Sequence, residues 1–84
     1  MIYRMEHYVD GKEETIILGE ISASAARSRA SRLSQKDGDL GSGVGHSVYL
    51  FGADNNGDDQ EHYNYFAGSL VEKDLVKDWD KHDA

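Results

Sequence analysis

The chain has 84 residues, with 16 acidic and 9 basic side chains, a formal net charge of -7 and no cysteine. This length fits one domain, near the size at which a single hydrophobic core is just sufficient. The absence of cysteine excludes disulfides and thiolate zinc sites, and the net negative charge argues against a protein whose whole surface binds nucleic acid or an anionic membrane.

No apolar run in the sequence is long enough to span a bilayer, and the N-terminus has no basic segment followed by an apolar core. We therefore expect a cytoplasmic protein with no signal peptide and no membrane anchor. We interpret residues 1–84 as a single small domain.

The first predicted element is a β-hairpin over residues 2–21. Large apolar and polar side chains alternate in its first strand, and Asp10-Gly11 then suits the positive φ angles of a type I′ turn. If Val9 pairs with Lys12, one face carries Tyr3, Met5, Ile16 and Leu18, and the other carries Arg4, Glu6, Tyr8, Thr15 and Ile17. The first face is the cleaner candidate for the core, although the second is partly apolar too.

A helix is predicted next, beginning at Ser22 or Ser24, whose side-chain oxygens suit an N-cap, and stopping near Gly38. Its apolar stripe is narrow and consists mainly of small side chains, namely Ala23, Ala26, Ala30 and Leu33. The other faces concentrate the basic groups of an otherwise acidic chain. The candidate phosphate contacts among them are Arg27, Arg29 and Arg32. The alternative is a solvated face whose arginines pair with the chain's own carboxylates.

The glycine-rich segment from Lys36 to His46 matches no phosphate-binding loop. A Walker loop needs a Lys-Ser or Lys-Thr pair after its last glycine, where this chain has His46 and Ser47. A dinucleotide-binding loop needs glycine at the position of His46 and leads from a strand into a helix. We expect a linker or a partner-contact loop here.

Two further strands are predicted at residues 47–52 and 62–70, joined by an acidic connector. The connector resembles a calcium-binding loop that would begin at Asp54. However, its sixth position is Asp59 instead of glycine, and its twelfth is Tyr65 instead of glutamate. An acidic, solvated turn is the better interpretation.

The sequence Ser69-Leu70-Val71-Glu72 matches the capping-box pattern and predicts a second helix from Leu70 to about Lys81. Its apolar side would consist of Val71, Leu75, Val76 and Trp79. The expected fold is therefore α+β, with one four-stranded antiparallel sheet, the element order β-β-α-β-β-α and two helices packed on one face.

The other face of that sheet would carry an apolar aromatic surface, which is a candidate for dimerisation or partner docking. Tyr8 and Ile17 would belong to this surface. The next strand would add either Tyr49 and Phe51 or Val48 and Leu50.

No catalytic or metal-binding motif has a supporting spacing in this sequence. The zinc-ligand spacing is missing for all four histidines, namely His7, His46, His62 and His82. A hydrolytic triad of His46, Asp54 and Ser47 would lack both a nucleophile elbow and an oxyanion feature. We therefore expect no enzymatic activity, no metal and no cofactor.

The leading functional hypothesis is a non-enzymatic protein-binding module whose clustered carboxylates mimic phosphate spacing and occupy a basic surface. In composition the chain resembles small acidic phage and mobile-element products that block nucleic-acid-binding host proteins, such as anti-CRISPR and anti-restriction inhibitors. The residues expected to contact the partner are Asp54, Asp58, Asp59, Glu61, Tyr8, Tyr63 and Tyr65.

Two alternatives stay open. A small nucleic-acid-binding domain would use the basic helix from Arg27 to Lys36 locally, despite the net charge. A self-associating structural module would form a homodimer, for which the aromatic sheet face is the candidate interface.

Overall fold

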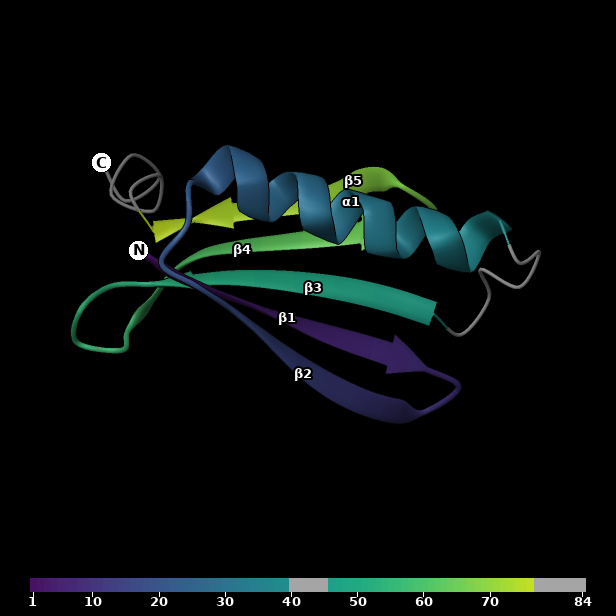
Figure 1. The fold of residues 1–84 in the computed structure, drawn as a ribbon, viewed down its shortest axis with the longest axis horizontal. Helices are drawn as coiled ribbons and strands as arrows, with labels where there is room; N and C mark the ends of the chain where they lie inside the picture. Colours follow the sequence, from purple (N-terminus) through teal and green to yellow (C-terminus); the bar gives the residue numbers. More distant parts are fainter. Residues whose placement is uncertain (40–45, 77–84) are drawn as a thin grey trace, which may run out of the picture.

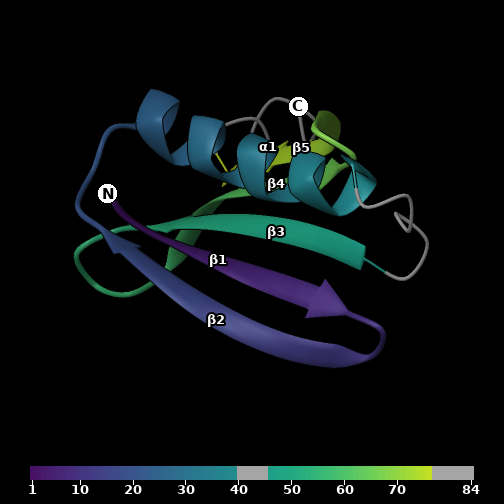
Figure 2. The same ribbon diagram turned by 45° about the vertical axis from the view of Figure 1, so that its right-hand side comes forward.

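The computed structural model describes residues 1–39 and 46–76. Its elements in chain order are β1 (Ile2–Val9), β2 (Lys12–Gly19), α1 (Ala23–Asp39), β3 (His46–Ala53), β4 (Asp59–Phe66) and β5 (Ser69–Leu75). The strands form one antiparallel sheet in the spatial order β2-β1-β3-β4-β5. Figure 1 shows α1 lying along one face of this sheet, where it contacts β3, β4 and β5. In the described part of the chain no helix covers the opposite face, which we call the open face (Figure 2).

The first hairpin has the predicted register from the turn as far as Arg4 and Ile17, beyond which the register shifts and Tyr3 pairs with Gly19. Val9 pairs with Lys12, and the two turn residues between them, Asp10 and Gly11, have φ angles of 50° and 84°. The face chosen for the core is confirmed, because its four apolar side chains all belong to the hydrophobic core or pack against it. Within the first hairpin, alternation along the strands was therefore sufficient to sort the faces.

The helix begins as the sequence indicates. The Ser22 hydroxyl accepts a hydrogen bond from the Ala25 N–H at 3.1 Å, which makes Ser22 the N-cap. Ala26 and Ala30 are fully buried, whereas Ala23 at the first position is exposed. Since these alanines are small, α1 can lie close to the sheet, and the larger side chains of the strands supply most of the buried apolar area.

The core lies between α1 and the sheet. Its buried residues are Tyr3, Met5, Ala26, Ala30, Val48, Leu50, Tyr63, Tyr65 and Leu75. Gly52 makes room for one of them, because a Cβ at this position would lie 2.7 Å from Cε1 of its cross-strand partner Tyr3. The missing side chain at Gly52 thus allows the Tyr3 ring to lie against the backbone of β3.

The predicted four-stranded sheet with two helices is wrong, because the sheet has five strands and α1 is the single helix of the described chain. The segment expected to run straight from strand into helix turns back at Ala67 and Gly68, whose φ angles are 49° and 87°. Ser69 pairs with Phe66 as β5 begins, so the capping-box serine starts a strand. A capping box contributes only about 1 kcal/mol, whereas pairing with β4 satisfies backbone groups along the whole segment.

The side chains of the expected second helix are correspondingly rearranged. Val71 is 57% exposed and does not cover the sheet, whereas Leu75 is buried in the core. Trp79 and the residues from 77 onward lie outside the described chain, as do positions 40–45 of the glycine-rich segment. No helix in the described residues has the length and apolarity needed to cross a bilayer.

Two serines of α1 fasten the β4–β5 turn to the helix. The buried hydroxyl of Ser34 accepts the Gly68 N–H at 2.9 Å, and the hydroxyl of Ser31 donates to the Gly68 carbonyl at 2.7 Å. Both backbone polar groups of Gly68 are thereby satisfied by side chains. This contact fixes the β4–β5 hairpin against the C-terminal half of α1.

Candidate functional site

The open face carries a row of aromatic rings that crosses three strands. Tyr8 on β1 meets Tyr49 on β3 edge to face, with ring centroids 5.4 Å apart. The His62 ring on β4 stacks on Tyr49 at 5.6 Å and on Phe51 at 4.8 Å. Of the two sets left open for the third strand, the structure thus selects Tyr49 and Phe51 for this face, while Val48 and Leu50 are buried beneath α1.

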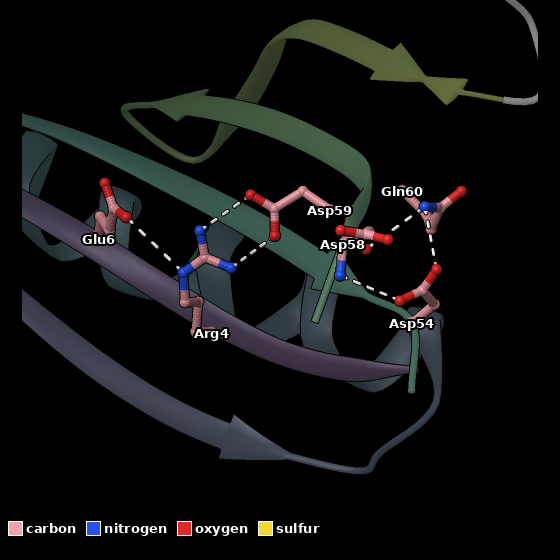
Figure 3. Close-up of polar contacts among 6 residues, drawn as sticks. All are labelled: Arg4, Glu6, Asp54, Asp58, Asp59 and Gln60. Carbon is pink, nitrogen blue, oxygen red and sulfur yellow. Dashed lines mark hydrogen bonds and ion pairs between the residues drawn. The ribbon is translucent and has the colours of Figure 1, made fainter. Parts of the chain in front are cut away.

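One end of this row holds an arginine from the chain itself, Arg4, whose contacts with Glu6 and Asp59 are drawn in Figure 3. The Arg4 guanidinium carbon lies 4.4 Å from the centroid of Phe51. Its Nη1 and Nη2 atoms donate to the two carboxylate oxygens of Asp59 at 2.8 and 3.1 Å, and its Nε lies 3.7 Å from Glu6. The hydrogen bonds from Arg4, and to a smaller extent its charge, lower the pKa of Asp59 below its usual value. The open face thus already holds one guanidinium against an aromatic ring and a bidentate carboxylate.

A shallow hollow of about 470 Å³ lies on the same face, beside Arg4, and its floor and rim include Glu6, Tyr8, Tyr49 and His62. The Tyr8 hydroxyl donates to Glu6 at 3.1 Å, which raises the pKa of Tyr8. Rings and a carboxylate therefore surround this hollow, as they surround the guanidinium of Arg4. Such a combination favours a cationic group.

The charge of the open face is strongly negative. Cross-strand pairing places five carboxylates of the described residues on it, against the single arginine Arg4; they are Glu6, Glu13, Asp59, Glu72 and Asp74. Apolar side chains lie among them. Ile17 is 69% exposed, and Ile2 and Phe66 are also exposed on this side. The face is thus acidic and aromatic at once.

The acidic connector between β3 and β4 uses its carboxylates internally (Figure 3). Asp54 Oδ1 accepts the N–H groups of Asn56 at 2.9 Å and Asp58 at 3.0 Å, while its Oδ2 accepts the Gln60 amide at 3.3 Å. This is the geometry of a tight turn organised by an aspartate. Of the expected contact residues in this segment, Asp58 has an exposed side chain, whereas Asp54 and Asp59 are already engaged within the chain.

Glu61, Tyr63 and Tyr65, also expected to contact a partner, lie on the helix side of the sheet. The rings of Tyr63 and Tyr65 are buried beneath α1. Glu61 Oε1 accepts the hydroxyls of Tyr63 at 2.8 Å and Tyr3 at 3.0 Å. Burial, together with Glu61, raises the pKa of Tyr3 to about 12 and raises that of Tyr63 still further above its usual range. These residues form part of the folded core and its edge, and Tyr8 is the one tyrosine of the expected set on the open face.

The three arginines of the basic helix differ in their surroundings. Arg27 is half-buried, and its Nε donates to the Tyr65 hydroxyl at 3.1 Å. Arg29 and Arg32 are exposed. Among the side chains that the structure describes, no carboxylate lies at ion-pair distance from any of the three. The expected pairing of these arginines with the chain's own acid groups is therefore not seen there.

Among the described residues, the histidine and triad arrangements considered from the sequence do not come together, and His82 lies outside the described chain. His46 begins β3 and Asp54 follows its last residue, so the two lie at opposite ends of that strand. His46 Nε2 instead lies 3.9 Å from Asp10. Across the described positions, no three His, Asp or Glu side chains are arranged to hold a metal ion.

Sequence reasoning missed two parts of the open-face site, namely the His62 ring within the aromatic row and Arg4 at its end. Arg4 was placed on the same face as Tyr8 and Glu6 by strand alternation, which was a usable signal. Its partner Asp59 is 55 residues away in the chain, however, and only the register of the whole sheet brings the two together.

Comparisons of the chain with protein-family models, curated proteins and solved structures find no match. The functional argument therefore depends on the geometry described above.

Proposed function

We propose that the chain is a non-enzymatic protein-binding module whose open face docks a partner through arginine or lysine side chains. The observation that carries this proposal is Arg4, which rests 4.4 Å from the Phe51 centroid while Asp59 binds both of its terminal nitrogens. The guanidinium of Arg4 thus lies between an aromatic ring and a carboxylate. A cation of the partner would find the same combination of groups at the neighbouring rings.

Charge and exposure support the same proposal. Five carboxylates and one arginine on the face favour a cationic partner by electrostatic complementarity and oppose a phosphate backbone. Exposed Ile2, Ile17 and Phe66 supply apolar contact area around the rings. Aromatic anchors supply affinity, and an acidic rim orients a cationic partner.

This proposal moves the contact surface away from the acidic connector. Asp54, Asp59 and Glu61 already accept hydrogen bonds within the chain, so their use as phosphate mimics would require those bonds to break. The proposal includes an inhibitor of the anti-CRISPR or anti-restriction kind as one case. In that case the open face of this chain would dock in a basic groove of a nucleic-acid-binding host protein.

The first experiment titrates the folded chain with a short arginine-glycine peptide and follows the side-chain NMR signals of Tyr8, Tyr49 and His62. We expect saturable shifts at these rings and an affinity that falls steeply with added salt. Tyr49→Ala should weaken binding about threefold to tenfold, since a cation–π contact contributes ~1 kcal/mol.

A charge-matched pair of variants controls for the net charge. Glu6→Gln removes a carboxylate beside the hollow, whereas Glu14→Gln removes one from β2 on the helix side of the sheet. Only Glu6→Gln should weaken the peptide. Equal effects of the two changes, or ring shifts produced instead by a single-stranded oligonucleotide, would refute the proposal. If the peptide result holds, proteins from the native cell that are retained on the immobilised chain should be retained more weakly on the Tyr49→Ala variant.

A further inference from the structure

A second surface feature lies on the helix side, away from the open face. It is a groove of about 550 Å³ between α1 and β4. The residues that matter for its chemistry are Ser24, Arg27, Ser28, Arg32, Tyr63 and Tyr65. Its volume is in the range of sites that hold small organic ligands.

The helix contributes its donors to this groove by its periodicity. Ser24, Ser28 and Arg32 follow one another at intervals of four residues, so they form one row along α1, with Arg27 beside it. Arg29 is two residues from Arg27 and projects about 200° around the helix from it, away from the groove. Two arginines and two serine hydroxyls thus converge, while a third arginine on the same helix does not.

Arg27 is held in position by the two tyrosines beneath it. Its Nε donates to the Tyr65 hydroxyl at 3.1 Å, and its guanidinium carbon lies 5.0 Å from the centroid of the Tyr63 ring. A guanidinium has five N–H donors, so the terminal nitrogens keep donors for another acceptor. An arginine fixed in this way loses less side-chain entropy when it binds an anion.

The local charge of the groove is opposite to that of the whole chain. Lys73 lies on β5 directly opposite Tyr63 and therefore on the same side of the sheet as the groove. Glu61 is the neighbouring carboxylate on that side, and the hydroxyls of Tyr3 and Tyr63 already donate to it. In a chain with net charge -7, two arginines that form no ion pair among the described side chains mark a place where a negative ligand is favoured.

We infer that this groove binds the phosphate group of a phosphate monoester, with Arg27 and Arg32 as the charged donors and the hydroxyls of Ser24 and Ser28 as neutral ones. The planar guanidinium fork matches two phosphate oxygens, and the groove leaves room for the organic group that carries the phosphate. This inference is independent of the proposed function, because it concerns the opposite face of the sheet.

The test is an NMR titration of the full chain at constant ionic strength. The probes are inorganic phosphate, O-phosphoserine and adenosine 5′-monophosphate, with sodium chloride as the reference salt. We expect saturable shifts of the Arg27 Nε–H and of the Ser24 and Ser28 amides. Tighter binding of one of the two organic probes than of inorganic phosphate would identify the source of the phosphate.

Three variants distinguish specific binding in the groove from non-specific attraction of an anion to the basic helix. Arg32→Ala and Arg27→Lys should each weaken the best probe about tenfold, because the first removes a charge and the second removes the fork while keeping the charge. Arg29→Ala removes an equal charge from α1 outside the groove and should leave binding unchanged. The amide spectrum of each variant checks that it remains folded. Absence of saturable shifts, or equal weakening by Arg29→Ala and Arg32→Ala, would overturn the inference.

Discussion

Glu61 joins two tyrosines from different strands at the edge of the core. Tyr3 comes from β1 and Tyr63 from β4, and both hydroxyls donate to the same Glu61 oxygen. From the sequence, an acidic residue in a segment rich in carboxylates is expected to be solvent-exposed. Here, however, the charge of Glu61 is used inside the chain, where it holds two buried phenols as neutral donors.

The raised pKa values of these tyrosines predict a loss of stability in alkali. Since the folded chain holds the Tyr3 proton up to about pH 12 and the unfolded chain only to about pH 10, their contribution is full below pH 10 and is lost as the pH rises through this window. The free energy of unfolding, measured with urea, should therefore fall between about pH 10 and about pH 12. In Tyr63→Phe the fall should be shallower, because one of the two linked protons is gone.

Glu61→Gln provides the companion measurement. It removes the charge but not the burial, and burial is the larger cause of both shifts. Tyrosinate absorbance should therefore show Tyr3 and Tyr63 ionising at lower pH than in the unaltered chain, yet still above an exposed tyrosine. An unchanged titration in Glu61→Gln would mean that Glu61 does not act on these phenols.

At the scale of elements, the first hairpin, α1 and the strand at residues 47–52 could be predicted from sequence, whereas β5 in place of a second helix could not. Asp10-Gly11 is a strong turn signal, and it fixed both the register and the faces of the first hairpin. Ala67-Gly68 is weaker, because alanine rarely adopts positive φ, and a capping box follows it immediately. Two local signals competed there, and pairing of β5 with β4 decided between them.

The candidate site shows the same limit. Alternation along β1 was enough to place Tyr8 on the open face, and Arg4 shares that face. The row is completed by His62, which stacks between rings of β3 because β3 and β4 pair in one particular register. Contacts between strands distant in the sequence depend on that register, and short-range patterns do not specify it.

The docking of the β4–β5 turn on α1 predicts unequal costs for two similar substitutions. Gly57 and Gly68 have φ angles of 84° and 87°, so alanine at either position should cost about 1 kcal/mol of backbone strain. At Gly68 the new Cβ would also lie 3.1 Å from Gln35 Cβ, whereas at Gly57 nothing lies within 4 Å. Gly68→Ala should therefore be the more destabilising by ~1 kcal/mol in urea denaturation.

Ser34→Ala tests the other half of that contact. It would leave the Gly68 N–H without its acceptor next to a buried position, which should cost about 1–3 kcal/mol. Similar stability of Gly68→Ala and Gly57→Ala, together with a neutral Ser34→Ala, would indicate that the turn is not fastened to the helix.

At the scale of the whole molecule, charge is sorted by the two faces of the sheet. Counting the described residues alone, the open face has five carboxylates and one arginine, which gives it a formal net charge of -4 with histidine counted as neutral. Around the groove, Arg27, Arg32 and Lys73 outnumber the one neighbouring carboxylate of the described chain, Glu61. An overall charge of -7 therefore describes neither side, and a partner would meet a different field on each.

This division bears on self-association through the exposed apolar residues of the open face. Two copies placed face to face would bring together two surfaces of net charge -4, so we expect a monomer at low ionic strength. At about 1 M salt the Debye length falls to about 3 Å, and contact through Ile17 and Phe66 should then raise the average mass in sedimentation equilibrium. Ile17→Asp should suppress that rise, because Ile17 is 69% exposed on this face, whereas Arg29→Ala on the helix should not. A dimer that is stable at low salt and unaffected by Ile17→Asp would contradict this prediction and show that the two copies associate through another surface. The open face would then remain accessible to a cationic partner.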